Sequence, residues 1–141
     1  MKESPLDSLV VSVKINKTIS DVWNAWSNPE LMPNWLVLND NFKAKIIKFE
    51  FRTGGDSNYI MASKDGKLNF AYNSIISIII PFEKIEYNLE DGRTAILSFS
   101  VSKIQTMVQM EFEPLAQQDV GAQLYGWQTI LDNFKNYLER E

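Results

Sequence analysis

The chain has 141 residues, 45% of them hydrophobic and 23% charged, which suits one globular domain with its own core. Its net charge is −4 and its 14 Lys and Arg are scattered along the sequence, which argues against a nucleic-acid partner. It contains no cysteine and no histidine, so disulfides, thiolate chemistry and His-dependent catalytic triads are excluded. We therefore expect a single domain over residues 1–141.

The chain carries no apolar segment of the length that a signal peptide or a membrane span requires. Its first five residues are polar or charged apart from Met1 and Pro5, and its longest apolar run, 75–82, is interrupted by Ser77. A transmembrane helix needs about 20 apolar residues. These features predict a cytoplasmic protein with no integral membrane association.

The first elements in chain order are a strand and two short helices. Residues 9–15 alternate between apolar and polar side chains, the pattern of a half-buried strand. Thr18 followed by Asp21 resembles a helix cap, and the apolar helix that follows ends at Asn28-Pro29. Pro29 suits the first turn of a second short helix that closes near Trp35.

A series of strands joined by short turns follows. Period-two alternation or apolar runs predict strands over residues 43–52, 58–62, 68–80, 85–89, 95–101 and 108–112. Gly54-Gly55, Asp65-Gly66 and Asp91-Gly92 supply turns, and Pro81 ends the longest strand. Short connections favour antiparallel pairing between sequential neighbours. In the first of these strands we expect Ile47, Phe49 and Phe51 to share one face.

The last element is an amphipathic helix from about residue 119 to residue 141. Its apolar side chains recur in steps of three and four: Val120, Leu124, Trp127, Leu131, Phe134 and Leu138. Its polar side carries Gln123, Gln128, Asp132, Lys135, Asn136 and Glu139. Gly126 lies inside the helix, where glycine costs about 1 kcal/mol relative to alanine. Two interpretations are open: tight packing against a neighbouring element, or room for a ligand beneath Trp127.

These elements predict an α+β fold, in which a curved antiparallel sheet of about seven strands is covered by the long C-terminal helix. Four stretches carry a family resemblance in their order and spacing: Asp21-Val22-Trp23-Asn24-Ala25-Trp26 with Asn28-Pro29-Glu30 and Trp35, Phe51-Arg52-Thr53-Gly54-Gly55 with Asp65-Gly66, Ile80-Pro81-Phe82-Glu83-Lys84-Ile85-Glu86-Tyr87, and Gly126-Trp127-Gln128-Thr129-Ile130-Leu131. With these stretches the sequence resembles the START-related helix-grip (SRPBCC) superfamily, and within it the proteins similar to the activator of the heat-shock chaperone ATPase.

The resemblance implies a hydrophobic cavity between the sheet and the long helix, which the superfamily uses for lipids, sterols and other apolar molecules. It implies no single reaction, because the shared motifs are mostly structural. Family members commonly have a glycine shortly before the Ile-Pro step, whereas 74–80 is here almost continuously β-branched. That departure suggests a fuller core and a smaller cavity.

Large, adaptable side chains are expected to face the interior and are the candidate ligand-binding residues. They are Trp35, Phe51, Tyr59, Phe70, Tyr72, Tyr87, Phe99, Met110 and Trp127, with Phe49 and Met61 on the same predicted faces. The alternative is that these side chains simply fill the core. The tyrosines favour a pocket, because a buried hydroxyl needs a partner and can orient the polar end of a ligand.

Charged side chains offer weaker candidates. Arg52 and Asp56 flank the glycine pair, either at a cavity mouth or as a surface ion pair. Glu111 and Glu113 alternate with apolar residues and are expected to face solvent rather than to form a catalytic pair. The sequence shows no nucleophile motif, phosphate loop or metal cluster, so we expect no catalytic residue, metal or cofactor.

The leading hypothesis is a non-enzymatic module that binds a small apolar or amphipathic molecule. The second is an enzyme resembling the cyclases and dehydratases of the superfamily, for which a buried carboxylate beside an inward tyrosine would be the discriminating feature. The third is a chaperone co-regulator, suggested by the family resemblance alone. A homodimer is also open, because the strand containing residues 75–80 is either central or an edge that a partner covers.

Overall fold

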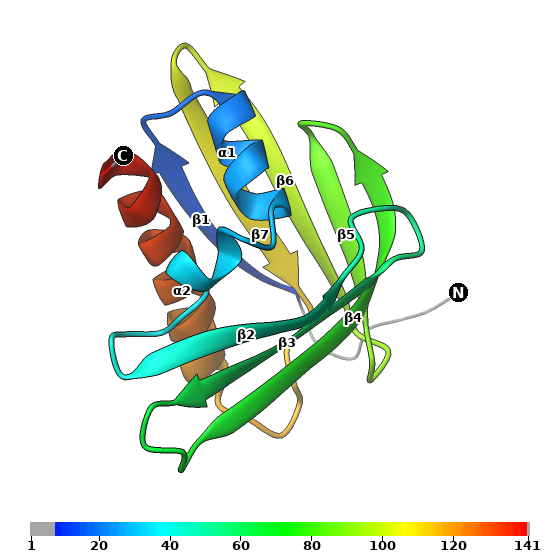
Figure 1. Ribbon diagram of the computed structural model, residues 1–141. Helices are drawn as coiled ribbons and strands as arrows, with labels where there is room; N and C mark the ends of the chain where they lie inside the picture. Colours follow the sequence, from blue (N-terminus) through cyan, green and yellow to red (C-terminus); the bar gives the residue numbers. More distant parts are fainter. Residues whose placement is uncertain (1–7, 141) are drawn as a thin grey trace.

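The computed structural model describes residues 8–140, which form seven strands, two α-helices and one 3₁₀ turn (Figure 1). In chain order they are β1 (Leu9–Ile15), α1 (Ile19–Ser27), η1 (Met32–Asn34), β2 (Phe42–Phe49), β3 (Asp56–Ser63), β4 (Asn69–Ile80), β5 (Lys84–Leu89), β6 (Thr94–Ser102), β7 (Gln105–Phe112) and α2 (Val120–Arg140). The α+β architecture and the seven strands are as the sequence predicts. The second short helix is a single 3₁₀ turn.

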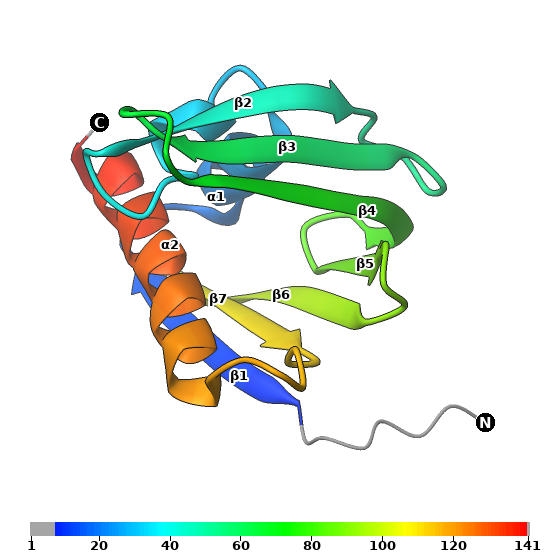
Figure 2. The same cartoon turned by 90° about the horizontal axis from the view of Figure 1, so that it is seen from below.

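All seven strands belong to one antiparallel sheet in the order β1-β7-β6-β5-β4-β3-β2. From β2 to β7 each strand pairs with its neighbour in sequence, and β1 joins the far side of β7. Figure 2 shows the sheet curling around the interior while α2 lies across the open side. The strand β4 is flanked by β3 and β5, so the interpretation in which it is an edge is wrong. A homodimer stays a prediction.

Local sequence signals account for several element boundaries. The Thr18 hydroxyl accepts a hydrogen bond from the backbone N–H of Asp21 at 3.3 Å and caps α1. Pro81 directly follows the last residue of β4, because proline has no N–H to continue the ladder. Gly66 and Gly92 adopt positive φ angles of 77° and 93° in the two predicted hairpin turns.

The strand β2 departs from the predicted alternation. Ile46 pairs with Tyr59 and Lys48 with Asn58, so Ile47 is the extra residue of a bulge. The bulge turns Ile47 outward, and its side chain is 53% exposed, while Ile46 and Phe49 pack against the core. The prediction that Ile47 shares the face of Phe49 is therefore wrong, because one inserted residue reverses the pleat.

Polar side chains of α2 anchor the helix to the edge strand β1. Gln128 donates to the backbone carbonyl of Ser12 at 2.9 Å, and the Lys135 ammonium donates to the carbonyl of Lys14 at 2.7 Å. The carboxylate of Glu139 accepts from the backbone N–H of Asn16 at 2.8 Å. These bonds cover part of an edge that would otherwise be open to pairing with another chain.

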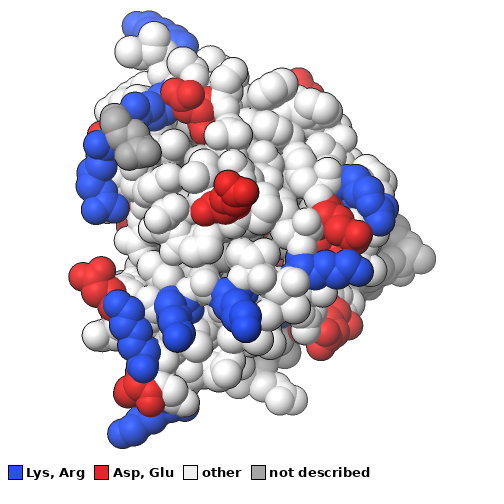
Figure 3. All heavy atoms as spheres, viewed as in Figure 1, with Lys and Arg blue, Asp and Glu red and all other residues white. Residues whose placement is uncertain are grey.

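The other edge strand, β2, is protected differently. Its outward side chains include Lys43, Lys45 and Lys48, all exposed. Figure 3 shows a row of basic side chains along this strand, with acidic side chains scattered over the same face. Charged lysines on an edge strand disfavour pairing with a second sheet.

A dense aromatic cluster fills the interior beneath the C-terminal half of α2. The rings of Trp26 and Trp35 stack with centroids 4.6 Å apart, and Phe134 contacts both at 5.2 and 4.7 Å. The indole N–H of Trp35 donates to the backbone carbonyl of Ala25 at 3.2 Å. This cluster binds α1, η1 and α2 together and closes one end of the space inside the sheet.

Candidate functional site: a cavity beneath the C-terminal helix

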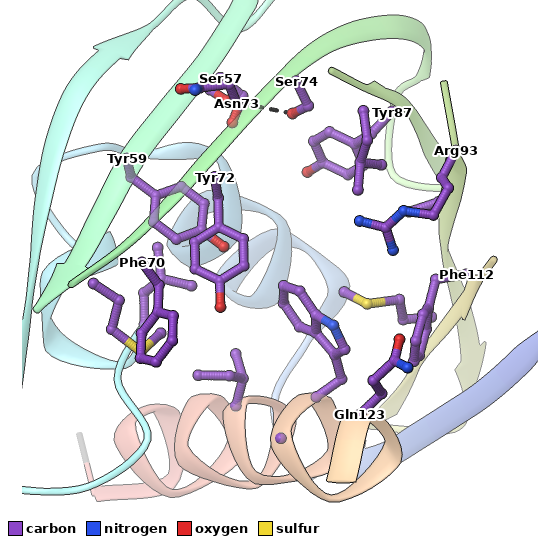
Figure 4. A pocket seen from close by; sticks show the side chains of 18 of the residues that line it. Ser57, Tyr59, Phe70, Tyr72, Asn73, Ser74, Tyr87, Arg93, Phe112 and Gln123 are labelled. Carbon is purple, nitrogen blue, oxygen red and sulfur yellow. Dashed lines mark hydrogen bonds between the residues drawn. The ribbon is translucent and has the colours of Figure 1, made fainter. Parts of the chain in front are cut away.

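A cavity of about 440 Å³ lies between the curved sheet and the N-terminal half of α2 (Figure 4). Its volume lies within the roughly 300–1,000 Å³ that is typical of small-molecule pockets. Its walls come from the inner faces of β3 to β7, from η1 and the residues after it, and from α2. Trp26, Trp35 and Ile130 border the cavity, so the packed cluster closes one end of it.

Seven of the nine predicted site residues line this cavity: Trp35, Tyr59, Phe70, Tyr72, Tyr87, Met110 and Trp127. Met61, expected on the same face, also lines it. Their convergence follows from the period-two alternation, which directs every second side chain of β3, β4, β5 and β7 to the concave face.

Phe51 and Phe99 are not among the lining residues, and neither is Phe49. Instead Trp23 of α1 packs edge-on against Phe51 and Phe99 with centroids 5.7 and 5.1 Å apart, and Phe49 stacks on Phe51 at 5.9 Å. The placement of Phe51 and Phe99 in a pocket is therefore corrected. They face inward where α1 covers the sheet, and its tryptophan occupies the space.

Cross-strand pairs give the wall formed by β3 and β4 a polarity gradient. Tyr59 lies opposite Tyr72, with rings stacked at 5.0 Å and 20°. Ser57 lies opposite Ser74 on one side of this pair, and Met61 lies opposite Phe70 on the other. The wall therefore changes from hydroxyl-bearing to apolar side chains along its length. The two serines were missed by the sequence analysis, although each lies two residues from a predicted tyrosine.

The three tyrosines differ in their hydrogen bonding. The Tyr87 hydroxyl accepts a hydrogen bond from the indole N–H of Trp26 at 2.9 Å. Within residues 8–140, the hydroxyls of Tyr59 and Tyr72 have no protein hydrogen-bond partner. Figure 4 shows both rings on the cavity wall, with the Tyr72 hydroxyl directed toward α2.

Burial raises the pKa of all three phenols. Loss of hydration raises the pKa of Tyr59 well above its ordinary value, with smaller contributions from Tyr72 and Tyr87. Burial also raises the pKa of Tyr72, and it raises the pKa of Tyr87 to about 12 against the opposing effect of the Trp26 hydrogen bond. At neutral pH each of these side chains therefore retains its O–H donor.

Gly126 leaves open space in the roof of the cavity. A Cβ atom placed on it would meet no heavy atom within 4 Å outside its own stretch of helix. The interpretation of Gly126 as a point of tight packing is therefore wrong, and open space beside Trp127 is what the structure shows. Trp127 reaches down to the rings of Tyr72 and Phe112, at centroid distances of 6.0 and 6.2 Å.

Exposed lining residues mark the mouth of the cavity between β4, the turn from β5 to β6, and the start of α2. Arg93 lines it, with its Nε donating to the Asp91 carboxylate at 2.8 Å and its Nη1 donating to the backbone carbonyl of Glu113 at 3.0 Å. The Glu113 carboxylate accepts from the backbone N–H of Thr94 at 2.8 Å. Glu113 is half-buried at the mouth, so its expected solvent-facing position is corrected: β7 ends at Phe112 and the alternation ends with it.

Gln123 also lines the cavity, although the helical pattern placed it on the wet side. Its side-chain amide bonds both backbone groups of Leu115, accepting at 2.8 Å and donating at 3.0 Å. The connection before α2 thus folds over the helix start and buries one side of Gln123. Neither Gln123 nor Arg93 carried a sequence signal beyond its position next to a turn or helix start.

The charged pair considered beside Gly54-Gly55 lies outside the cavity. The Lys48 ammonium is 3.0 Å from the Asp56 carboxylate, and Arg52 is 3.6 Å from Glu50. Arg52 and Asp56 therefore belong to two separate exposed ion pairs and are not paired with each other. Exposed pairs of this kind contribute little stability. The described residues contain no group of three or more acidic side chains that could hold a metal ion.

The fold and site define a helix-grip protein, a class in which a curved sheet and a long helix enclose a cavity. Residues 16–139 match the family described as activator of Hsp90 ATPase homolog 1-like protein, and the chain belongs to that family. The resemblance predicted from the sequence is confirmed. No curated protein matches the chain.

Solved structures agree with this assignment. The chain is similar to an AHSA1-like protein from Aeromonas hydrophila, with 27% identity, a TM-score of 0.81, and coverage of 94% of this chain and 93% of that one. A protein from Cytophaga hutchinsonii also shares 27% identity, with a TM-score of 0.81 and coverage of 94% and 92%. A protein from Chromobacterium violaceum shares the fold at 16% identity, with a TM-score of 0.84 and coverage of 96% and 100%.

No helix within residues 8–140 combines the length and apolar character needed to cross a membrane.

Proposed function

We propose that this protein binds a small apolar or amphipathic molecule in the cavity beneath α2 and does so without catalysing a reaction. The observation that carries the proposal is the open space under Gly126, in a cavity of about 440 Å³ bounded by aromatic and methionine side chains. A glycine inside a helix costs about 1 kcal/mol relative to alanine. Here the missing side chain leaves a volume that a ligand can occupy.

The lining suits an apolar occupant that carries few polar groups. Tyr59, Tyr72, Met110 and Trp127 present rings and a thioether to the interior, and such side chains bind flat or flexible apolar molecules with good contact. Ligand pockets typically combine an apolar wall with a few placed polar groups. The tyrosine hydroxyls and the hydrogen-bonded groups at the mouth supply those.

The enzymatic alternative depends on a carboxylate beside an inward tyrosine. Among the described residues, the buried polar side chains are Ser57, Ser63 and Thr106. The carboxylates that line the cavity are exposed or half-buried ones at its mouth. No feature of the described residues favours the enzymatic alternative. The family name suggests chaperone regulation, which a pull-down and an ATPase assay with a heat-shock chaperone would test.

Two substitutions of Gly126 test whether the cavity is the binding site. Gly126→Phe should fill it, whereas Gly126→Ala also relieves the helix penalty of glycine but adds only one methyl group. We expect titration with the neutral fluorescent probe N-phenyl-1-naphthylamine to show at least about tenfold weaker binding to the Phe variant, a difference of about 1.4 kcal/mol. The Ala variant should bind within about twofold of the unchanged protein.

Native mass spectrometry of freshly purified protein provides a second measurement, with a denatured sample as its reference. A small molecule retained by the unchanged protein and lost from Gly126→Phe would support the proposal and identify the ligand class. Equal probe binding by both Gly126 variants would contradict it and move the binding site to another surface.

A further inference from the structure

The hydroxyls of Tyr59 and Tyr72 indicate what kind of ligand the cavity accepts. Both rings lie on the cavity wall, and within residues 8–140 neither hydroxyl has a protein hydrogen-bond partner. No buried side-chain polar atom of the described residues lacks a partner, so both hydroxyls keep surface that is open to the cavity and can donate to a molecule there. A bound molecule with an acceptor oxygen between these strands would satisfy them.

No charged side chain compensates for an ionised ligand at that depth. Burial and the two neighbouring tyrosines raise the pKa of Tyr59, and no Asp, Glu, Lys or Arg of the described chain contributes to that shift. A carboxylate or an ammonium placed beside Tyr59 would therefore be buried without a counter-charge. Burying an unpaired ion is far more costly than burying a neutral polar group.

The mouth of the cavity also disfavours anions. Arg93 is the cation among the described lining residues, and Asp91 and the Glu113 carbonyl already engage two of its nitrogens. Glu90, Asp91 and Glu113 place three carboxylates around the same opening. An anionic molecule entering there would be repelled, an effect that salt weakens.

We propose that the ligand is a neutral apolar molecule with an acceptor oxygen that accepts hydrogen bonds from Tyr59 and Tyr72. Its apolar part lies against Met61, Phe70 and Trp127. This inference rests on the proposed binding function. It names the chemical class: ketones, esters, ethers or alcohols on an apolar skeleton, as opposed to fatty acids, other carboxylates or amines.

Three probes of nearly equal shape test the inference by displacement of N-phenyl-1-naphthylamine. They are 2-acetylnaphthalene, a neutral ketone; 2-naphthoate, its anionic counterpart; and 2-isopropylnaphthalene, which has no oxygen. We expect the ketone to bind at least about tenfold more tightly than the carboxylate, because the carboxylate loses hydration without a counter-charge. It should bind about fivefold more tightly than the hydrocarbon, the effect of one net hydrogen bond.

Removal of the hydroxyls assigns these preferences to the tyrosines. The Tyr59→Phe/Tyr72→Phe variant should bind the ketone and the hydrocarbon equally, and the Tyr72→Phe single variant should lose part of the fivefold difference. The control is Tyr125→Phe, since Tyr125 is 74% exposed and lies outside the cavity lining. It should keep the full preference. Circular dichroism checks that each variant is folded.

The outcomes separate this inference from the function on which it rests. If the fluorescent probe binds but 2-naphthoate displaces it as well as the ketone does, at low and at high salt, the neutral-ligand inference is wrong while cavity binding stands. If the ketone preference survives in the double variant, the tyrosines are not the donors and the inference is overturned. If the fluorescent probe does not bind at all, both proposals fail.

Discussion

The two halves of α2 cover parts of the sheet that are filled in opposite ways. Under the C-terminal half, Phe134 and Leu131 are fully buried, and Phe134 meets Trp26 and Trp35 within 5.2 Å. Under the N-terminal half, Gly126 faces open space and Trp127 is only half-buried. One amphipathic helix therefore serves as part of a solid core at one end and as the roof of a cavity at the other.

The difference comes from the elements beneath the helix. At the filled end, α1 and η1 insert two tryptophans between the sheet and α2. At the open end, within residues 8–140, β3 and β4 face the helix across the cavity without an intervening element. Stability should accordingly depend mainly on the filled half, and binding on the open half.

Truncation of a large side chain in each half should have the largest effect and would break the comparison most directly. Phe134→Ala should lower the free energy of unfolding by about 3–5 kcal/mol, because it leaves a hole in a close-packed cluster. Trp127→Ala should lower it clearly less, since it extends a cavity that already exists, but should weaken probe binding. Urea unfolding measures the loss of stability in each variant, with equal m-values as a control, and fluorescence titration measures probe binding. Equal losses of stability would show that the two halves are packed alike.

Alkaline pH tests whether the open half excludes water. The pKa of Tyr87 is about 12 in the folded protein against an ordinary value of 10.0, so the folded state retains a proton that the unfolded state loses between these values. This contribution is fully present below pH 10 and is lost as pH rises toward 12, at about 1.4 kcal/mol per pH unit and on the order of 3 kcal/mol in all. Urea unfolding at several alkaline pH values measures the slope, and tyrosinate absorbance follows ionisation.

The Tyr87→Phe variant is the control for that slope. Between pH 10 and 12 its unfolding should release one proton fewer than unfolding of the unchanged protein, so its stability should fall less steeply with pH. If the buried tyrosines ionised with the ordinary pKa of 10.0 while the protein stayed folded, water would already fill the cavity. The assignment of Tyr87 to a buried environment that raises its pKa would then be wrong.

The smallest expected changes in stability are those of Phe substitutions at two tyrosines of the cavity wall. Tyr87→Phe should lower stability by about 1–3 kcal/mol, because the Trp26 indole N–H loses its acceptor. Tyr59→Phe should change stability by less than about 0.5 kcal/mol or raise it, since its hydroxyl makes no hydrogen bond with residues 8–140. Thermal or urea unfolding of the two variants measures these changes. A difference between them would show that Tyr87, through its bond to Trp26, is joined to the packed half, and that Tyr59 belongs to the open half. An equally large loss for Tyr59→Phe would reveal a partner for its hydroxyl.

Much of the fold was predictable because its signals are local. The cap at Thr18, the stop at Pro81 and the turns at Gly66 and Gly92 each lie where the sequence predicts them. The bulge at Ile47 was not predictable, because either Ile46 or Ile47 satisfies an alternating apolar pattern. Pairing with β3 decides between them.

Most of the site residues predicted from the sequence line the cavity, but the sequence did not predict where the cavity ends. Alternation directed Tyr59, Tyr72 and Tyr87 to the concave face, where they lie. The same rule directed Phe51 and Phe99 inward, but Trp23 from a distant part of the chain covers them. A strand pattern specifies which face a side chain takes and contains no information about what lies opposite.

The sequence by itself determined the order of the elements, the antiparallel pairing of neighbouring strands and the apolar face of α2, because these follow from periods of two and 3.6 residues. Only the tertiary structure decided that the space under Gly126 stays open while the space under Phe134 is filled. The apolar spacing of α2 is the same over both. Whether a cavity remains depends on the summed volumes of side chains from α1, η1 and five strands, which meet only when the sheet has curved.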